Sequence, residues 1–410
     1  MKLIRLTAAL ILVLTFSGCA TVSRNAVPKD LVGKAMVRDM TEIRMTQGAR
    51  NPAFEQDLLE AAKYPDEAIY PAGPDGKRTY PILVISGGGD KGAYGAGLLK
   101  GWSQSGTRPV FKVVTGVSVG ALTAPFAFLG KEYDADLEKF YTTTSTKDVM
   151  IPSAPLDILN GDSMASTQPL ANMIAKIITP EMLTKIAAEH ERGRRLYVGT
   201  VNLDAQRFVV WNMGAIAKRG DAELFRKVIR ASAAIPIVFP PVHLPVQVNG
   251  VAYEEMHVDG GTMTQMFGLF KIMEGIGGDE YKAANVDTSK MRSSYYLIRN
   301  GYVGGTYKKV ENKLGTIAGS AMDLMINTQG IGDTYRIYEF MKLKGNDYNL
   351  AYIPNDCRPE AKEMFDPAAM KVLFDRGYQD VVRGQIWHKT PPGLNDNDSE
   401  DTFLTTRRSS

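Results

Sequence analysis

Two short apolar runs, each followed by glycine and then by a helix-like stretch, organise the first half of the chain. Residues 80–86, "YPILVIS", lead into Gly87-Gly88-Gly89, and "AYGAGLLKGW" follows. Residues 110–115, "VFKVVT", lead into a second glycine turn and the stretch "ALTAPFAFL". Runs rich in β-branched residues predict strands, and the longer stretches after them predict helices. Two successive strand, turn and helix units predict a parallel sheet with helices on its faces.

The rest of the chain continues the same α/β pattern. We expect helices at 170–178, 181–190 and 221–234, strands at 195–203, 207–212 and 294–300, and a hairpin around Asn249-Gly250. From about residue 301 to Trp387 the pattern predicts mainly helix. The fold class is therefore α/β with a mostly parallel sheet. Such sheets bind ligands at the carboxyl ends of their strands, where both glycine turns are expected to lie.

The start of the chain has the pattern of a secretory signal. An apolar stretch at residues 6–16 follows two basic residues and precedes small residues and Cys19. The stretch is too short to span a bilayer permanently. It resembles a bacterial lipoprotein signal, although Phe16 stands where that pattern prefers a smaller aliphatic residue. The resemblance implies removal of residues 1–18, lipid attachment at Cys19 and location in the cell envelope. Ala20 points to the outer membrane, because an Asp at this position would favour retention at the inner membrane. The alternative is an ordinary signal with an incidental cysteine.

Composition and spacing divide the mature chain. Residues 19–78 form an extension that ends in the Pro/Gly-rich "YPAGPDGKR", and its partly helical spacing suggests packing on the main domain. Residues 79–390 form the main domain, because 44% hydrophobic and 23% charged residues suffice for a large core. Residues 391–410 form a polar tail that we expect to be disordered.

The charge and cysteine content argue against a nucleic-acid partner, an internal disulfide and a zinc site. The net charge of +3 is spread without a basic stripe, so it offers no electrostatic reason to propose a nucleic-acid partner. Cys357 is the one cysteine besides Cys19, so no internal disulfide is expected once Cys19 is acylated. No Cys/His cluster has the spacing of a zinc site, so no metal is expected.

The glycine-rich residues 87–92, "GGGDKG", suggest three kinds of loop, and two of these lack a residue that they require. A dinucleotide-binding loop requires an acidic residue after the next strand, where Gly116 stands. A phosphate-binding P-loop requires Ser or Thr after Lys91, where Gly92 stands. The third possibility is an anion-binding concavity, in which backbone N–H groups hold a reaction oxyanion and Lys91 adds positive charge. The alternative is that the glycines merely permit tight packing.

Ser118 is the candidate nucleophile. Gly116 and Gly120 complete the G-x-S-x-G pattern of a nucleophile elbow between a strand and a helix. A serine needs a base to take its proton, which is usually a histidine. The chain has four histidines, namely His190, His243, His257 and His388. None lies in a loop typical of a catalytic histidine, and we expect His190 to be solvated and His388 to lie at the surface.

Asp259 is the alternative base. It ends an alternating strand, where it and His257 should face the same side. A carboxylate can itself act as base when it is partly desolvated and within hydrogen-bond reach. The segment "DGG", Asp259-Gly260-Gly261, is also typical of a turn capped by Asp.

The order "GGGDKG", "GVSVG" and "DGG" resembles the patatin-like phospholipases, and so do "TVNLDAQRFVVWN" and "ASAAIPIVFPP". The resemblance covers about residues 80–300 and implies a patatin-like three-layer fold. It assigns Ser118 as nucleophile and Asp259 as its partner in a dyad without histidine. It assigns the oxyanion hole to the glycine loop, namely Gly87, Gly88, Gly89, Lys91 and Gly92. Asp90 departs from the small residue that relatives often carry.

The resemblance implies hydrolysis of acyl esters of glycerolipids or phospholipids without metal or organic cofactor. The implied partners are a lipid substrate and, through the N-terminal anchor, a membrane. Two alternatives stay open at this point. One is a Ser-His-Asp esterase that uses His257 or His388. The other is a lipid-binding envelope lipoprotein without catalytic activity.

Overall fold

The computed structural model describes residues 24–394, except residues 65, 155–156, 159–160, 269–277, 306, 308 and 385. The predicted signal segment with Cys19 and residues 395–410 of the predicted tail lie outside this range. Within it, no helix has the length and apolar character needed to cross a bilayer.

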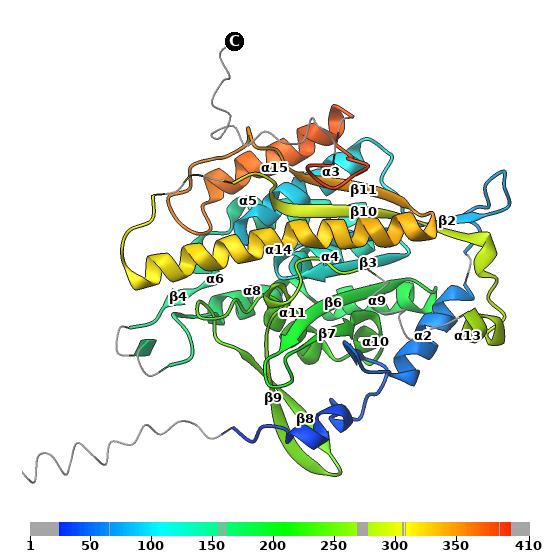
Figure 1. Ribbon diagram of the computed structural model, residues 1–410, viewed down its shortest axis with the longest axis horizontal. Coiled ribbons are helices and arrows are strands. Elements are labelled where there is room, and N and C mark those ends of the chain that lie inside the picture. Colours follow the sequence, from blue (N-terminus) through cyan, green and yellow to red (C-terminus); the bar gives the residue numbers. More distant parts are fainter. Residues whose placement is uncertain are drawn as a thin grey trace, which may run out of the picture.

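One large sheet forms the centre of the molecule (Figure 1). Nine strands join it in the part of the chain that the structure describes. Along the sheet these are β1 (Arg44–Thr46), β7 (Arg207–Asn212), β6 (Arg195–Asn202), β3 (Val113–Val117), β2 (Arg78–Ile85), β10 (Met291–Tyr302) and β11 (Asp347–Ile353). The hairpin of β8 (Val242–Val248) and β9 (Val251–Asp259) joins through β9, which pairs with β6. A separate two-stranded sheet contains β4 (Ile151–Pro152) and β5 (Ala165–Ser166).

The middle of the large sheet is parallel. Strands β6, β3, β2, β10 and β11 run in one direction, whereas β1, β7 and β9 pair antiparallel at the other side. This arrangement confirms the predicted α/β fold with a mostly parallel sheet. The carboxyl ends of β2 and β3 therefore meet at one edge, and the glycine loop and Ser118 follow them directly.

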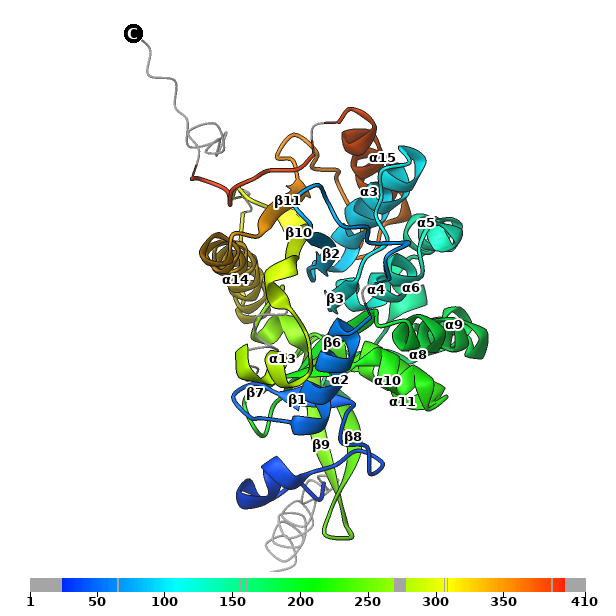
Figure 2. The same cartoon turned by 90° about the vertical axis from the view of Figure 1, so that its right-hand side faces the viewer.

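Helices cover both faces of the sheet (Figure 2). One face carries α3 (Gly92–Gln104), α4 (Val119–Leu129), α9 (Pro180–Glu191), α10 (Met213–Lys218) and α11 (Ala222–Ser232), with α5 (Asp134–Thr143), α6 (Thr146–Val149), α8 (Gln168–Ile177) and α15 (Pro367–Val382) packed around them. The other face carries α2 (Pro52–Ala62) and the long α14 (Leu314–Lys344), with α13 (Gly278–Ala283) nearby. The short 3-10 helices are Lys29–Lys34, Gly89–Lys91, Lys131–Tyr133, Gly260–Thr262 and Thr288–Lys290.

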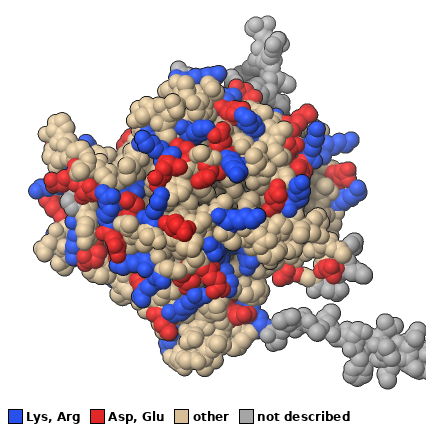
Figure 3. Space-filling model, turned by 180° about the vertical axis from the view of Figure 1, so that it is seen from behind, with Lys and Arg blue, Asp and Glu red and all other residues tan. Residues whose placement is uncertain are grey.

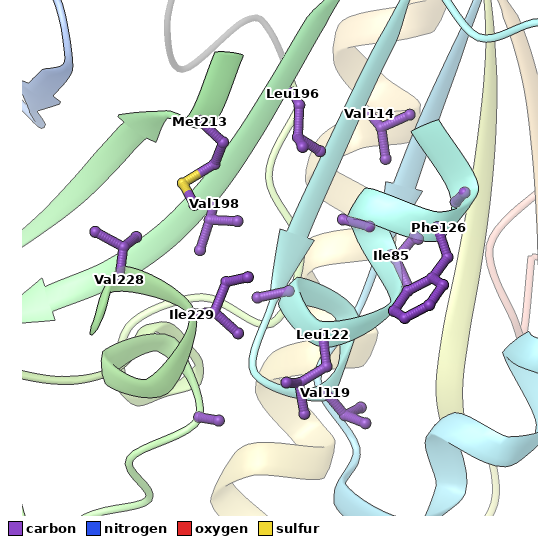
Figure 4. Close-up of a cluster of buried hydrophobic side chains, with 14 of the residues drawn as sticks. Ile85, Val114, Val119, Leu122, Phe126, Leu196, Val198, Met213, Val228 and Ile229 are labelled. Atoms are coloured by element: carbon purple, nitrogen blue, oxygen red, sulfur yellow. The ribbon is translucent and has the colours of Figure 1, made fainter. Parts of the chain in front are cut away.

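Alternation along the buried strands divides the core into two apolar layers. In β2, Leu83 and Ile85 join the cluster under α4, whereas Ile82 and Val84 join the cluster under α14. Figure 4 shows the first layer, in which side chains of β2, β3 and β6 face those of α4 and α11. The two layers hold the sheet rigidly, so the loops at its edge have fixed positions.

Several elements, among them α5, β11 and α10, differ from the sequence-based expectations. Strand β11 lies in a region predicted to be mainly helical, because its nearly continuous burial gives no alternation that distinguishes a strand from a buried helix. Helix α10 was not predicted. It is only six residues long, and the Asn212 side chain caps it by accepting a hydrogen bond from the Ala215 N–H at 3.1 Å.

The N-terminal extension packs on the main domain. Strand β1 pairs with β7 and forms the edge of the large sheet, and Arg24 forms an ion pair of 2.6 Å with Asp204. Asp57 of α2 accepts a hydrogen bond of 2.7 Å from Arg195 and lies 3.2 Å from Nε2 of His190. The expectation of a solvated His190 is therefore wrong, because an acidic residue from the extension buries and pairs it.

Charges of both signs are mixed on the outer surface. Seen from behind, Lys and Arg are interspersed with Asp and Glu over most of the face (Figure 3). This pattern agrees with the small net charge of +3.

Candidate active site

Ser118 lies on a strained turn between β3 and α4. Its backbone has φ 55° and ψ −126°, a conformation that a residue with a side chain rarely adopts. A Cβ on Gly116 would lie 2.4 Å from the carbonyl oxygen of Gly120, and one on Gly120 would lie 2.4 Å from that of Ile85. Both positions therefore require glycine. The strain presents the Ser118 side chain at the edge of the sheet, as a nucleophile elbow does.

Asp259 meets Ser118 from the end of β9. The Ser118 hydroxyl donates a hydrogen bond of 2.5 Å to Oδ2 of Asp259. The N–H of Gly261 donates to Oδ1 at 2.7 Å, so Asp259 also caps the turn that follows it. A Cβ on Gly260 would lie 2.5 Å from the carbonyl oxygen of Gly199, which explains the first glycine after the aspartate. Asp259 of the "DGG" segment therefore both caps the turn and accepts the hydrogen bond from Ser118.

Burial alters the acidity of Asp259. Its side chain is buried, and this burial raises the pKa of the carboxyl to about 7, against the lowering effect of the hydrogen bonds from Ser118 and Gly261. A carboxylate with a pKa near neutrality is a stronger base than an exposed one, yet it is still ionised in neutral or slightly alkaline solution.

The glycine loop offers two backbone donors beside this pair. The N–H groups of Gly88 and Gly89 form no hydrogen bond with any residue that the structure describes. Both residues have positive φ, 152° and 61°, and a Cβ on Gly88 would lie 2.0 Å from the carbonyl oxygen of Asn300. The N–H of Gly87, by contrast, donates to the carbonyl oxygen of Gln265 at 3.3 Å. The conformation thus leaves two adjacent N–H groups free to hold an anion.

The remaining predicted members of the oxyanion hole have other contacts. The N–H of Gly92 donates to the carbonyl oxygens of Gly89 and Asp90, so it closes the 3-10 turn. The Lys91 ammonium lies 3.3 Å from the Asp90 carboxylate, which balances part of its charge. The predicted set is therefore reduced to Gly88 and Gly89 as free donors.

The histidines occupy other surroundings. Nδ1 of His257 lies 2.9 Å from the Thr200 hydroxyl, and Nε2 lies 3.1 Å from the Glu255 carboxylate. Both nitrogens of this fully buried ring are thus engaged away from Ser118, and burial lowers its pKa. His257 therefore has both ring nitrogens engaged by Thr200 and Glu255.

Two other candidate histidines, His388 and His243, contact residues of β11 and of the β8–β9 hairpin. The His388 ring stacks on Tyr352 of β11, with 4.5 Å between ring centroids, and is half-buried. Nδ1 of His243 lies 3.6 Å from Glu254 on the β8–β9 hairpin.

Ser232 supports the strained turn and was not identified from the sequence. Its hydroxyl accepts a hydrogen bond of 3.0 Å from the Ser118 N–H and donates one of 2.6 Å to the carbonyl oxygen of Gly199. It lies 114 positions from Ser118, inside the segment "ASAAIPIVFPP". The one sequence feature that could have drawn attention to Ser232 is its position as a polar residue at the apolar end of a helix. Spacing along the chain could not show that it contacts Ser118.

Replacing Ser232 by Ala is expected to weaken both the fold and the site. The change leaves the buried Ser118 N–H without its partner, which costs about 1–3 kcal/mol of unfolding free energy. Urea unfolding measures this loss, and kcat for ester hydrolysis should fall because Ser118 is less firmly positioned. A variant with unchanged stability and kcat would show that this hydrogen bond is dispensable.

An apolar pocket opens beside Ser118. Its lining comes from several helices and loops: Gly89, Ser118, Val119, Leu122, Phe140, Tyr141, Thr144, Val149, Leu170, Met173, Ala233, Ile235, Phe239, Phe365 and Met370. The apolar lining favours a hydrocarbon group as ligand. The sequence did not reveal this pocket, because its walls meet only in the folded chain.

Comparison with known families agrees with this site. Residues 83–267 match the family model described as patatin-like phospholipase, and this range includes the glycine loop, Ser118 and Asp259. Residues 83–267 are therefore similar to a patatin-like phospholipase domain.

Known structures give looser likenesses. VipD from Legionella pneumophila is 13% identical, with 77% of this chain and 70% of VipD covered and a TM-score of 0.37. Human GIVD cytosolic phospholipase A2 is 12% identical, with 80% of this chain and 53% of the phospholipase chain covered and a TM-score of 0.35. A chain of the SpcU–ExoU complex from Pseudomonas aeruginosa is 14% identical, with 76% of this chain and 57% of the matched chain covered and a TM-score of 0.28. No curated protein sequence matches significantly. The likeness to patatin-like phospholipases rests on the match at residues 83–267.

Proposed function

We propose that this protein hydrolyses acyl ester bonds of glycerophospholipids, with Ser118 as nucleophile and Asp259 as general base. The observation that carries the proposal is the 2.5 Å hydrogen bond between the Ser118 hydroxyl and the buried Asp259 carboxylate. Two free backbone N–H groups and an apolar pocket lie beside this pair. The engaged nitrogens of His257 argue against a Ser-His-Asp esterase built on that residue.

Acylation follows from these positions. Oδ2 of Asp259 takes the hydroxyl proton as Oγ of Ser118 forms a bond to the ester carbonyl carbon. The N–H groups of Gly88 and Gly89 hold the resulting oxyanion, and the N-terminus of α4 adds favourable dipole charge. The bond to the alcohol oxygen then breaks. The departing alcohol takes the proton from Asp259, and the acyl group stays on Ser118.

Deacylation repeats the same proton transfers with water. Asp259 takes a proton from a water molecule whose oxygen attacks the acyl carbon. The bond to Oγ breaks, Ser118 recovers its proton from Asp259, and a fatty acid leaves. The apolar pocket is suited to hold the acyl chain during both steps, because burial of each methylene contributes about 0.8 kcal/mol.

Product analysis tests the proposal. Purified protein and its Ser118→Ala variant are incubated with mixed phospholipid vesicles, and fatty acids and lysolipids are quantified by mass spectrometry. We expect release by the parent protein alone. Equal release from both proteins would refute the serine mechanism, and binding of lipid without release would favour the lipid-binding alternative.

The activity is expected to depend on the ionisation of Asp259. The base must be ionised, and its pKa is raised to about 7, so protonation removes activity below that value. We expect kcat/KM for a soluble ester to rise tenfold per pH unit below about 7 and to level off above it. A profile without an acid limb near this pH would contradict the assignment of Asp259 as base.

We also propose that Cys19 carries a lipid anchor that holds the protein at the outer membrane. The support is the signal-like pattern of residues 1–18. Mass spectrometry of the mature N-terminus should find a diacylglyceryl-modified Cys19. A free thiol on Cys19, or cleavage at another residue, would refute the anchor.

A further inference from the structure

Exposed apolar side chains flank the pocket on one side. Ile151 follows α6, whose Val149 lines the pocket, and Ile237 lies two positions before the pocket residue Phe239. Met164 joins them, because its N–H donates a hydrogen bond of 2.8 Å to the carbonyl oxygen of Ile237. All three side chains are exposed although they are large and apolar. These residues therefore form an apolar border beside the acyl pocket.

The N-terminal half of α14 carries a second exposed apolar surface. Leu314, Ile317, Leu324 and Met325 expose between 47% and 85% of their surface. Their spacing places them on one stripe of the helix. Asp323 is the one charged residue between positions 314 and 332. Exposed Leu, Ile and Met side chains on one stripe with so little charge nearby form a surface that an apolar partner can cover.

Both surfaces lie at the end of the molecule that carries the site. Helix α14 follows β10, which is parallel to β2, so its N-terminal end starts from the same sheet edge as the glycine loop. Figure 1 shows the yellow N-terminal end of α14 and strand β4 both on the left, and Figure 2 shows α14 and α6 on opposite faces of the sheet, so the two surfaces approach this edge from its two faces. We call the seven residues together the apolar rim: Ile151, Met164, Ile237, Leu314, Ile317, Leu324 and Met325.

The rest of α14 fixes the rim relative to the site. The buried Asp333 carboxylate accepts hydrogen bonds from the Gln265 N–H at 2.6 Å and from the Thr264 hydroxyl at 2.9 Å. Gln265 in turn accepts a hydrogen bond from the Gly87 N–H of the glycine loop. The helix that carries the apolar stripe is therefore bonded to the loop that follows Asp259. A surface that contacts the rim has a defined orientation to the pocket.

We propose that the apolar rim docks on the surface of a lipid bilayer and presents the pocket to phospholipid. This inference rests on the proposed function. The N-terminal chain favours lipid over another protein as the occupant. Residues 20–23 separate Cys19 from Arg24, which is fixed to Asp204, so a lipid on Cys19 holds the folded body within about 18 Å of the bilayer. Large exposed apolar patches on a single chain mark interaction surfaces.

Vesicle binding tests the rim directly. All proteins are the full chain with Cys19→Ser, which removes the anchor. The rim variant is Leu324→Glu/Met325→Glu. The matched control is Leu343→Glu/Val382→Glu, whose positions are also exposed but lie at the C-terminal ends of α14 and α15. Co-sedimentation uses vesicles of equal parts phosphatidylcholine and phosphatidylglycerol. We expect the rim variant to bind about tenfold or more weakly and the control to bind like the parent.

Further readouts separate the possible outcomes. Equal melting temperatures show that the exposed substitutions leave the fold intact. Equal vesicle binding by rim and control variants would overturn the proposal. So would a rim variant that dissociates a dimer in analytical ultracentrifugation while its vesicle binding is unchanged, because the rim then joins two copies of the chain. A parent that releases no fatty acid, with a rim variant that still loses vesicle binding, would refute hydrolysis and support docking.

Discussion

Replacing Ser118 by Ala is expected to lower fatty-acid release from phospholipid by at least about 10⁴-fold. The methyl group cannot form the acyl-enzyme, so the variant retains only what the pocket and backbone donors contribute to attack by water. The substitution removes the buried hydroxyl of Ser118 and with it the hydrogen bond that this hydroxyl donates to Asp259. Initial rates on phospholipid vesicles measure the effect.

Binding is the control for this variant. The pocket is lined mainly by other residues, so Ser118→Ala should bind a non-hydrolysable phospholipid analogue with nearly the same Kd as the parent. Loss of both binding and activity would indicate a damaged site and not a missing nucleophile. Retained hydrolysis would contradict the role of Ser118.

Replacing Asp259 by Asn is expected to lower kcat by about 10³-fold or more. Asn has the same shape and keeps an oxygen to accept the Gly261 N–H bond of 2.7 Å. It cannot take the Ser118 proton, so the acylation step loses its base. Stopped-flow measurement of the acylation burst with an activated ester tests this step separately from deacylation.

The stability of the Asp259 variant provides the control. Burial raises the pKa of Asp259 to about 7, above its ordinary value of 3.8, so the protonated carboxyl suits the fold better than the charged one. This contribution to stability is fully present below 3.8 and is lost as the pH rises through about 7. Asn does not ionise, so we expect Asp259→Asn at pH 8 to melt at or above the temperature of the parent. An inactive variant that melts far below the parent would leave its lost activity explained by unfolding.

Glycine positions made the core of the site predictable. Gly116, Gly120 and Gly88 each lie where a Cβ would collide with a backbone oxygen, so the local sequence encodes the turn geometry directly. Ser118 and Asp259 stand next to such turns, and the structure brings their side chains together at 2.5 Å. Short strands with glycine turns likewise predicted the parallel sheet.

Long-range contacts explain what could not be predicted. Ser232 supports Ser118 across 114 positions, and no local pattern connects the two. His257 does lie on the same strand as Asp259, but Thr200 of the neighbouring strand and Glu255 decide its partners. The pocket and the apolar rim depend on which helices meet in space. These features arise from tertiary packing, which the spacing of residues along one segment does not record.

Covalent labelling with a fluorophosphonate tests the central claim most directly. The reagent forms a stable phosphonyl ester with a serine whose proton a base removes, and peptide mass spectrometry locates the modified residue. A histidine-free Ser118–Asp259 pair predicts one adduct, on Ser118, that forms with an apparent pKa near 7 and disappears in Asp259→Asn. An adduct on another serine, or undiminished labelling of Ser118 in Asp259→Asn, would contradict it.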